Sequence, residues 1–326
     1  MISYTLNPNL KTFGPEGWKG TPVLNGRFVN LNHPFTPELK KLIRWQTEVN
    51  PQKNKKKQAH TLEIAADGDF FTHQHDCLVW LGHNSFYIRV SGKGILIDPV
   101  KGKASVVKRQ IPFPYALSDL AAITDYLLIT HDHRDHLDAP SIQEIGKTNA
   151  SVKVVTGLHM GSLIHRMFPF HQIEEAGWYQ QYTTPNEIDI WFLPSRHWGR
   201  RGLFDTNKRL WGSFLVKTQN RSIYVMGDSG MDDHFQKIGN LHPDIDFALM
   251  GIGAYSPEWF MHPSHMKPED SFEAFHMLGA RKFIPMHYAT FDLSDEPLSE
   301  PLERLNRYAQ PDKVLVPKPG QTILLS

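Results

Sequence analysis

A cluster of acidic and imidazole side chains directly after one short apolar run constrains this chain more than any other feature. Residues 126–138 read Tyr-Leu-Leu-Ile-Thr-His-Asp-His-Arg-Asp-His-Leu-Asp. The apolar half predicts a buried strand, and the polar half predicts a loop at its end. His131, His133, Asp135 and His136 can then point four metal donors into one small space, with nitrogen and oxygen atoms that suit zinc, manganese or iron. A polar surface loop is the alternative, but the pattern His-x-His-x-Asp-His is too specific for us to prefer it.

This pattern resembles the signature of the metallo-β-lactamase superfamily. The resemblance implies an α/β fold of the metallo-β-lactamase type, a four-layer αβ/βα sandwich with a dinuclear metal site at one edge. It also implies that His131 and His133 hold the first metal ion, and that Asp135 and His136 hold the second. Three further ligands must then follow downstream.

Three downstream residues fit that requirement, because each comes at the end of a predicted strand. His197 follows the strand expected at 187–193 and stands where the superfamily has the third ligand of the first metal. Asp228, in Gly-Asp-Ser-Gly, would bridge the two metals with its two carboxylate oxygens. Taken alone, this tetrapeptide is more typical of a turn. His287 ends the last long apolar strand and would complete the second metal site.

The resemblance therefore predicts two divalent metal ions and a full set of ligands. The predicted ligands are His131, His133, Asp135, His136, His197, Asp228 and His287. Zinc is the first choice for this nitrogen-rich set, with manganese or iron as alternatives. Two cations beside one water lower its pKa and supply hydroxide near neutral pH. Asp135 is also a predicted catalytic residue that orients this nucleophile or takes its proton.

Several flanking motifs are similar to the branch that contains N-acylphosphatidylethanolamine-hydrolysing phospholipase D. The similar segments are 80–83, 130–138, 194–198, 210–213, 227–230, 252–255, 259–261 and 295–297. The resemblance implies hydrolysis of the phosphodiester that joins N-acylethanolamine to phosphatidic acid. It also places His265 at the substrate phosphate as a second catalytic residue, although His265 could instead cap the helix that follows it.

Two other functions stay open at this point. A lactonase, or another hydrolase of small esters or phosphodiesters, would use the same two metals. A metal-binding sensor or scaffold would use them without catalysis, but no ligand is missing. A few positions depart from the family pattern, namely Arg134, Arg196, Tyr288 and the pair Asn84-Ser85. These departures bear on the choice of substrate, but they leave the predicted ligands intact.

The resemblance implies a small-molecule or phospholipid substrate, and composition gives no reason to add nucleic acid as a partner. The net charge of +1 gives no case for nucleic-acid binding, and a single cysteine, Cys77, allows no internal disulfide. We expect no transmembrane segment and no signal peptide, and therefore a cytoplasmic or membrane-peripheral protein. The lysine-rich segment 53–57 would suit an anionic membrane surface, or simply a solvated loop. The oligomeric state stays open, a homodimer included.

We expect residues 1–77 to form an N-terminal extension packed on a catalytic domain at 78–326. A helix would start at Pro37 with Thr36 as its cap. Asp98 would either bind a ligand histidine or end a strand in an Asp-Pro turn. The aromatic segments 168–170 and 259–261 would line an acyl groove or belong to the ordinary core.

Overall fold

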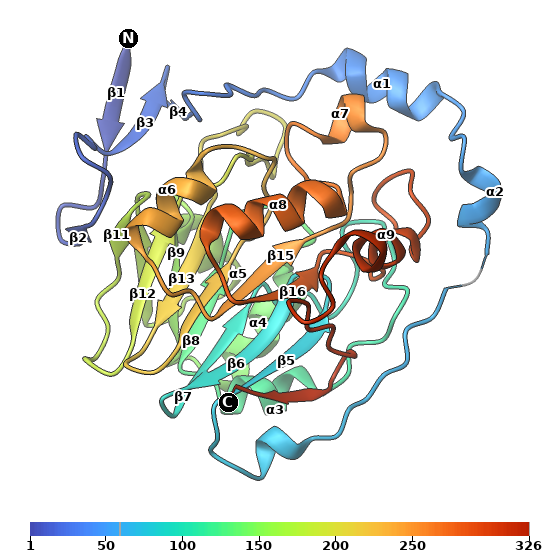
Figure 1. The fold of residues 1–326 in the computed structure, drawn as a ribbon. Coiled ribbons are helices and arrows are strands. Elements are labelled where there is room, and N and C mark those ends of the chain that lie inside the picture. Colours follow the sequence, from blue (N-terminus) through green and yellow to red (C-terminus); the bar gives the residue numbers. More distant parts are fainter. Residues whose placement is uncertain (59, 326) are drawn as a thin grey trace.

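Two seven-stranded β-sheets form the centre of the molecule, which was obtained as a computed structural model and is described for residues 1–58 and 60–325 (Figure 1). From edge to edge, the strands of the first sheet are β10 (Gln172–Ala176), β9 (Lys153–Gly157), β8 (Tyr126–Ile129), β7 (Lys93–Ile97), β6 (Ser85–Val90), β5 (Cys77–Gly82) and β17 (Thr322–Leu324). The pairs from β10 to β7 are parallel, and the remaining pairs are antiparallel.

The second sheet has the same plan, with parallel strands on one side and antiparallel strands on the other. Its strands are β16 (Lys282–Met286), β15 (Phe247–Gly251), β14 (Ser222–Val225), β13 (Ser213–Lys217), β12 (Asp189–Leu193), β11 (Gln180–Gln181) and β2 (Lys11–Thr12). The pairs β16–β15 and β15–β14 are parallel. Parallel strands buried on both faces read as continuous apolar runs, which is why these strands were predictable from sequence.

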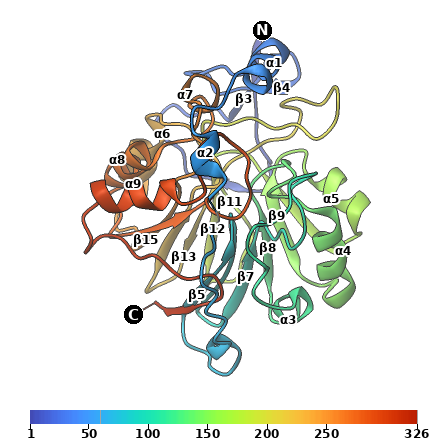
Figure 2. The ribbon, with the colours of Figure 1, turned by 90° about the vertical axis from the view of Figure 1, so that its right-hand side faces the viewer.

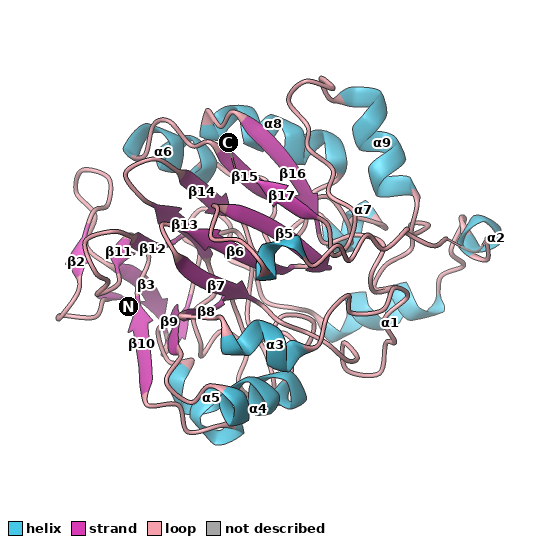
Figure 3. Ribbon diagram, turned by 90° about the horizontal axis from the view of Figure 1, so that it is seen from below, coloured by secondary structure: helices cyan, strands magenta, loops and turns pink. Residues whose placement is uncertain are grey.

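Helices cover the outer face of each sheet. The first sheet carries α3 (Leu117–Ala122), α4 (Ala139–Thr148) and α5 (Gly161–Met167), and the second carries α6 (His234–Leu241), α8 (Pro268–Leu278) and α9 (Glu300–Tyr308). Figures 2 and 3 show these two groups of helices on opposite sides of the strands. This order of layers confirms the predicted four-layer αβ/βα sandwich.

Side chains of β8 show how the layers are built. Leu128 lies in the large apolar core between the sheets, whereas Leu127 and Ile129 lie in a second core under α4 and α5. Neighbouring side chains of a strand point to opposite faces, so one short apolar run serves both cores. Both cores hold β8 in place, and the loop after it starts from a rigid position.

The N-terminal residues form a small sheet and a strap along one side of the molecule. The sheet contains β1 (Ile2–Thr5), β3 (Thr21–Leu24) and β4 (Arg27–Phe28), and the strap contains α1 (Leu39–Thr47), α2 (Lys53–Lys56) and the 3₁₀ turn η1 (Asp69–Phe71). Figure 1 shows α1 beside the short helix α7 (Glu258–Met261). Trp45 of α1 stacks on Phe260 of α7 with ring centroids 5.1 Å apart.

Several local predictions were wrong at the ends of elements. The helix expected to start at Pro37 begins at Leu39, with Glu38 rather than Thr36 at its N-cap. The sequence also predicts a short helix from Gly157 to His165, but α5 begins at Gly161, because Gly157 still pairs with Ala176 in the sheet. The lysine-rich segment contains a short helix. The proposed division at residue 77 stays a prediction, and its ranges include residues 59 and 326, which lie outside the described part.

Candidate metal centre

The seven predicted ligand residues lie together at one edge of the sandwich, in loops that follow strands. Four of them follow β8, His197 follows β12, Asp228 follows β14, and His287 follows β16. Strands β14, β15 and β16 are parallel, so their carboxyl ends meet at the same edge of their sheet. Residues more than 150 positions apart in the chain are thereby brought to one place.

The first group contains three histidines and one aspartate. One donor atom each from His131, His133, His197 and Asp228 lies within 4.8 Å of the others. Nδ1 of His133 is 2.9 Å from Nε2 of His131 and 3.1 Å from Nε2 of His197. These three nitrogens are the predicted ligands of the first metal.

The second group contains Asp135, His136, His287 and also His83, again within 4.8 Å. Asp228 lies between the two groups. Its Oδ1 is 3.1 Å from Nε2 of His287, and its Oδ2 is 3.2 Å from Nε2 of His136 and 3.6 Å from Nε2 of His197. One carboxylate thus faces both groups, as the predicted bridging role requires.

Hydrogen bonds on the outer side of two imidazoles determine which ring nitrogen faces the centre. Nδ1 of His197 lies 3.1 Å from the carbonyl oxygen of Ser264, which can only accept, so Nδ1 carries the proton. Nδ1 of His136 lies 2.8 Å from Oδ2 of Asp98. In both residues, Nε2 is then free to bind a cation. The hydrogen bond of Asp98 to a predicted ligand, one of its two expected roles, is therefore present.

The donor set fits divalent metal ions. Nε2 of His136 and Nε2 of His287 are buried, and although the oxygens of Asp228 lie 3.2 and 3.1 Å away, neither nitrogen makes a well-aligned hydrogen bond within the described residues. Buried polar atoms without a partner are costly, and a bound cation would satisfy both. Three imidazoles around one point and a carboxylate shared between two groups suit a nitrogen-rich ion such as zinc. The assignment of each ligand to a metal stays a prediction.

The charges in the centre are strongly coupled. Burial alone would raise the pKa of Asp228, but the imidazoles of His136 and His287 hold it well below its usual value. Burial and the neighbouring histidines keep the pKa of His131 well below its usual value. For His197, burial lowers the pKa strongly, despite the nearby Asp228. His136 and His287 differ, because despite burial the carboxylates of Asp228 and Asp135 hold the pKa of His136 well above its usual value and raise that of His287 to about 9. Since metals bind neutral imidazoles and ionised carboxylates, a bound cation would displace those protons.

His265 lies at the centre without belonging to either group of four. Its Nδ1 is 3.9 Å from Oδ2 of Asp228, and its ring centroid is 5.3 Å from that of His287. Burial lowers the pKa of His265 to about 4, so at neutral pH it is a neutral donor of one N–H. It does not cap α8, whose N-cap is Lys267.

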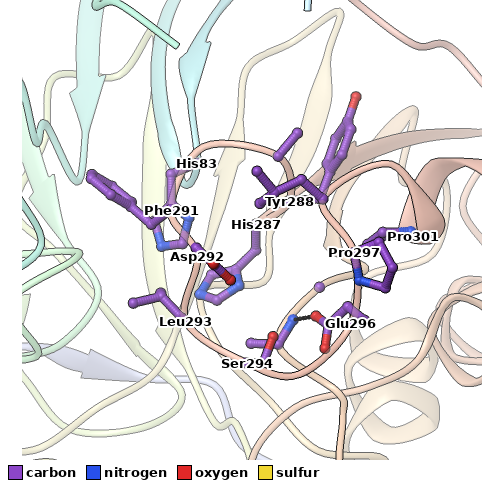
Figure 4. A pocket seen from close by; sticks show the side chains of 14 residues that line it. His83, His287, Tyr288, Phe291, Asp292, Leu293, Ser294, Glu296, Pro297 and Pro301 are labelled. Atoms are coloured by element: carbon purple, nitrogen blue, oxygen red, sulfur yellow. Dashed lines mark hydrogen bonds between the residues drawn. The ribbon is translucent and has the colours of Figure 1, made fainter. Parts of the chain in front are cut away.

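His83 is the residue that sequence reasoning left out of the centre. Its Nε2 is 3.1 Å from Oδ2 of Asp135, and its ring centroid is 4.0 Å from that of His287. Figure 4 shows the two rings side by side next to Phe291. The signal in the sequence was the turn at His83 and the motif 80–83, which resembles the family and so places this loop near the site. The motif does not show the contact between His83 and His287, because that contact is long-range.

A cavity of about 530 Å³ opens directly above the centre. Its floor includes His133, Asp135, Asp228, His265 and His287. One wall is apolar, with Leu39, Leu42 and Trp45 from α1, Phe260 and Met261 from α7, and Leu293. Arg134, Trp198 and Arg200 also line the cavity. The predicted groove role therefore fits part of segment 259–261.

Segment 168–170 belongs to the core, which is the second of the two roles expected for it. Phe170 is buried in the core under the helices of the first sheet, and Phe168 packs against that core. Neither residue lines the cavity.

Comparisons with known proteins agree with this geometry. A family model described as a beta-lactamase superfamily domain matches residues 93–288. The N-acyl-phosphatidylethanolamine-hydrolyzing phospholipase D 1 of Caenorhabditis elegans is 32% identical over 311 residues, which cover 87% of this chain and 87% of that protein. A UPF0173 metal-dependent hydrolase of Caldivirga maquilingensis is 31% identical over 267 residues, with 76% of this chain and 97% of that protein covered.

A solved structure also resembles this chain. It is Igni18, a metallo hydrolase of the archaeon Ignicoccus hospitalis, with 25% identity and a TM-score of 0.58. The match covers 77% of this chain and 98% of that one. Within the described residues, no helix has both the length and the apolar character needed to cross a bilayer.

Proposed function

We propose that this chain, which belongs to the metallo-β-lactamase superfamily and is a metal-dependent hydrolase, cleaves the phosphodiester of N-acylphosphatidylethanolamine-type lipids. The products would be an N-acylethanolamine and phosphatidic acid. The observation that carries this proposal is that one mostly apolar cavity, which also contains two arginines, opens onto a group of convergent metal donors. The similarity to the nematode phospholipase D supports the choice of lipid.

In this proposal the ligands are His131, His133 and His197 for one ion, and Asp135, His136 and His287 for the other, with Asp228 between them. Bound divalent cations would lower the pKa of a water molecule and offset negative charge on the phosphate oxygens. The imidazoles of His197 and His136 are held by Ser264 and Asp98, so their Nε2 atoms need little reorganisation to bind.

Asp135 is the proposed base. Burial would raise its pKa, but the charge of His136 and the hydrogen bond with Nε2 of His83 keep the pKa well below its usual value, so the carboxylate is ionised. It lines the floor of the cavity and can accept a proton from a water there. His265, as a neutral donor, can hold a non-bridging phosphate oxygen through its N–H.

The reaction balances without any further reactant. An oxygen of water forms a bond to phosphorus while the phosphorus–oxygen bond to the head group breaks. The head-group oxygen leaves with the bonding pair and takes a proton, giving the N-acylethanolamine. The apolar wall formed by α1, α7 and Leu293 is suited to acyl chains.

The test measures phosphatidic acid released from N-acylphosphatidylethanolamine in detergent micelles by zinc-loaded protein. We expect release by the wild type and a loss of at least about 100-fold in Asp135→Asn. Circular dichroism and metal analysis of the variant serve as controls for folding and loading. No release by a wild type that carries two metals per chain would refute the lipid proposal. The same protein would then be assayed on lactones and soluble esters.

A further inference from the structure

Two arginines line the cavity, and a third follows one of them in the chain. The two are Arg134 and Arg200, and the third is Arg201. Within residues 1–58 and 60–325, none of the three forms an ion pair, whereas nearby Arg209 pairs with both Asp132 and Asp205. Within the described residues, the guanidinium groups of Arg134 and Arg200 therefore line the cavity without a direct ion pair.

The carboxylates in the cavity do not neutralise these arginines. Asp135 and Asp228 face the histidines of the metal centre. Glu38, on the α1 side, lies 2.8 Å from Nζ of Lys41. Because each of these acids already has a cationic or imidazole partner, the arginines remain available to an anion from outside the protein.

The loop that carries Arg200 and Arg201 is firmly held. Oδ1 of Asp205 accepts hydrogen bonds from the backbone N–H groups of Gly202 at 2.8 Å and Arg201 at 3.2 Å. At its base, the N–H of Asn207 donates to the carbonyl of Gly199 at 2.7 Å. A guanidinium presented by such an ordered loop loses less entropy when it binds a ligand.

Arg134 and Arg201 also lie near one another, although they come from different loops. Nη1 of Arg201 donates to the carbonyl oxygens of Leu137 at 2.6 Å and Asp132 at 3.2 Å. Burial, and then the charge of Arg134, lower the pKa of Arg201. The carboxylates of Asp132 and Asp138 act on this pKa in the opposite direction, but within residues 1–58 and 60–325 neither forms an ion pair with Arg201. Like charges held close together are stabilised when an anion binds between them.

From this arrangement we infer that the natural substrate carries a second anionic group besides the scissile phosphate, bound by Arg134 and Arg200. This inference rests on the proposed function and narrows its substrate class. With the phosphate at the metal centre and the acyl chains on the apolar wall, the second anion belongs on the head-group side. A carboxylate on the head group, as in an N-acylated phosphatidylserine, is the simplest such substrate, and N-acylation removes the amine charge that would oppose binding.

The test compares N-acylphosphatidylserine with N-acylphosphatidylethanolamine of the same chains, both short enough to stay monomeric. We expect the wild type to prefer the serine lipid through a lower KM. In the double variant Arg134→Gln/Arg200→Gln, the ratio of kcat/KM between the two lipids should fall roughly tenfold. The preference should also weaken between about 50 and 500 mM salt, which a merely structural role would not produce. Arg307→Gln, an exposed arginine on α9, is the matched control and should keep the preference.

The outcomes separate this inference from the proposed function. If neither lipid is cleaved, binding of the same two monomeric lipids is measured by calorimetry. Tighter binding of the serine lipid that is lost in the double variant would support the anion site even though the reaction is wrong. Equal kcat/KM and equal binding for the two lipids would overturn it. So would a preference that appears only on vesicles, because the arginines would then act on the membrane surface.

Discussion

Nδ1 of His136 lies 2.8 Å from Oδ2 of Asp98, and neither side chain is exposed to solvent. The carboxylate of Asp98 also accepts hydrogen bonds from the N–H and Oγ1–H of Thr130 and from Nδ2 of Asn84. Every partner donates, so Asp98 acts as a pure acceptor that fixes the tautomer of a predicted metal ligand.

Replacing that acceptor should weaken metal binding. In Asp98→Asn, the new amide meets donors instead of acceptors, and the ring of His136 loses its orientation. We expect the dissociation constant of the more weakly held zinc to rise about 10- to 100-fold, measured by competition with a chromogenic chelator. Asp119→Asn, an exposed aspartate on α3, is the control. An unchanged zinc affinity in Asp98→Asn would show that His136 needs no such support.

The role of His265 can be separated from metal binding. In His265→Ala, one neutral N–H donor at the phosphate is lost, and we expect kcat/KM on the cleaved lipid to fall about 100-fold. Metal content by plasma emission spectroscopy should equal that of the wild type. The exposed His171 is suited to the matched control His171→Ala. Loss of one metal ion in His265→Ala would mean that His265 is a ligand, and our assignment would be wrong.

Removal of the metals should lower thermal stability. The nitrogens of His136 and His287 would stay buried without partners, and a ligand that binds only the folded state stabilises it by mass action. We expect dialysis against a strong chelator to lower Tm by roughly 5 °C or more, and excess zinc to restore it. Calorimetry on samples of known metal content checks this. Equal Tm values with and without metal would argue against a preformed dinuclear site.

Cys77 offers a prediction away from the site. The side chain is fully buried on β5, and burial raises the pKa of its thiol from 9.0 to about 11. Since the thiolate is the reactive form, the folded protein should react very slowly with a disulfide reagent at pH 8. The raised pKa contributes stability that is present below pH 9.0 and is lost as pH rises through about 11.

Unfolding in guanidinium chloride should expose one reactive thiol per chain within minutes. This reaction serves as a control for the activity of the reagent and for the protein concentration. Fast modification of the native protein would mean that β5, at the centre of the first sheet's antiparallel half, opens readily.

Strand positions and the grouping of the seven site residues could be read from the sequence. Continuous apolar runs such as Leu127-Leu128-Ile129 mark strands buried on both faces, and polar residues directly after them mark the edge where loops meet. The first residues of helices were harder to predict from the sequence. The turn before α1 has no capping side chain, so the propensity of Thr36 misled the prediction by two residues.

By itself, the sequence determined that metal donors could gather at one edge of the sheets. One group, His131 to His136, follows a single strand, and the others, His197, Asp228 and His287, each follow another strand. The donors could gather because strand ends in a layered α/β fold meet at that edge. Only the tertiary structure decided that His83 lies within 4.8 Å of Asp135, His136 and His287, that α1 lines the cavity, and that Arg134 and Arg200 line the same cavity. Each of these depends on contacts between distant segments. Such contacts arise from the packing of whole layers, which no local pattern encodes.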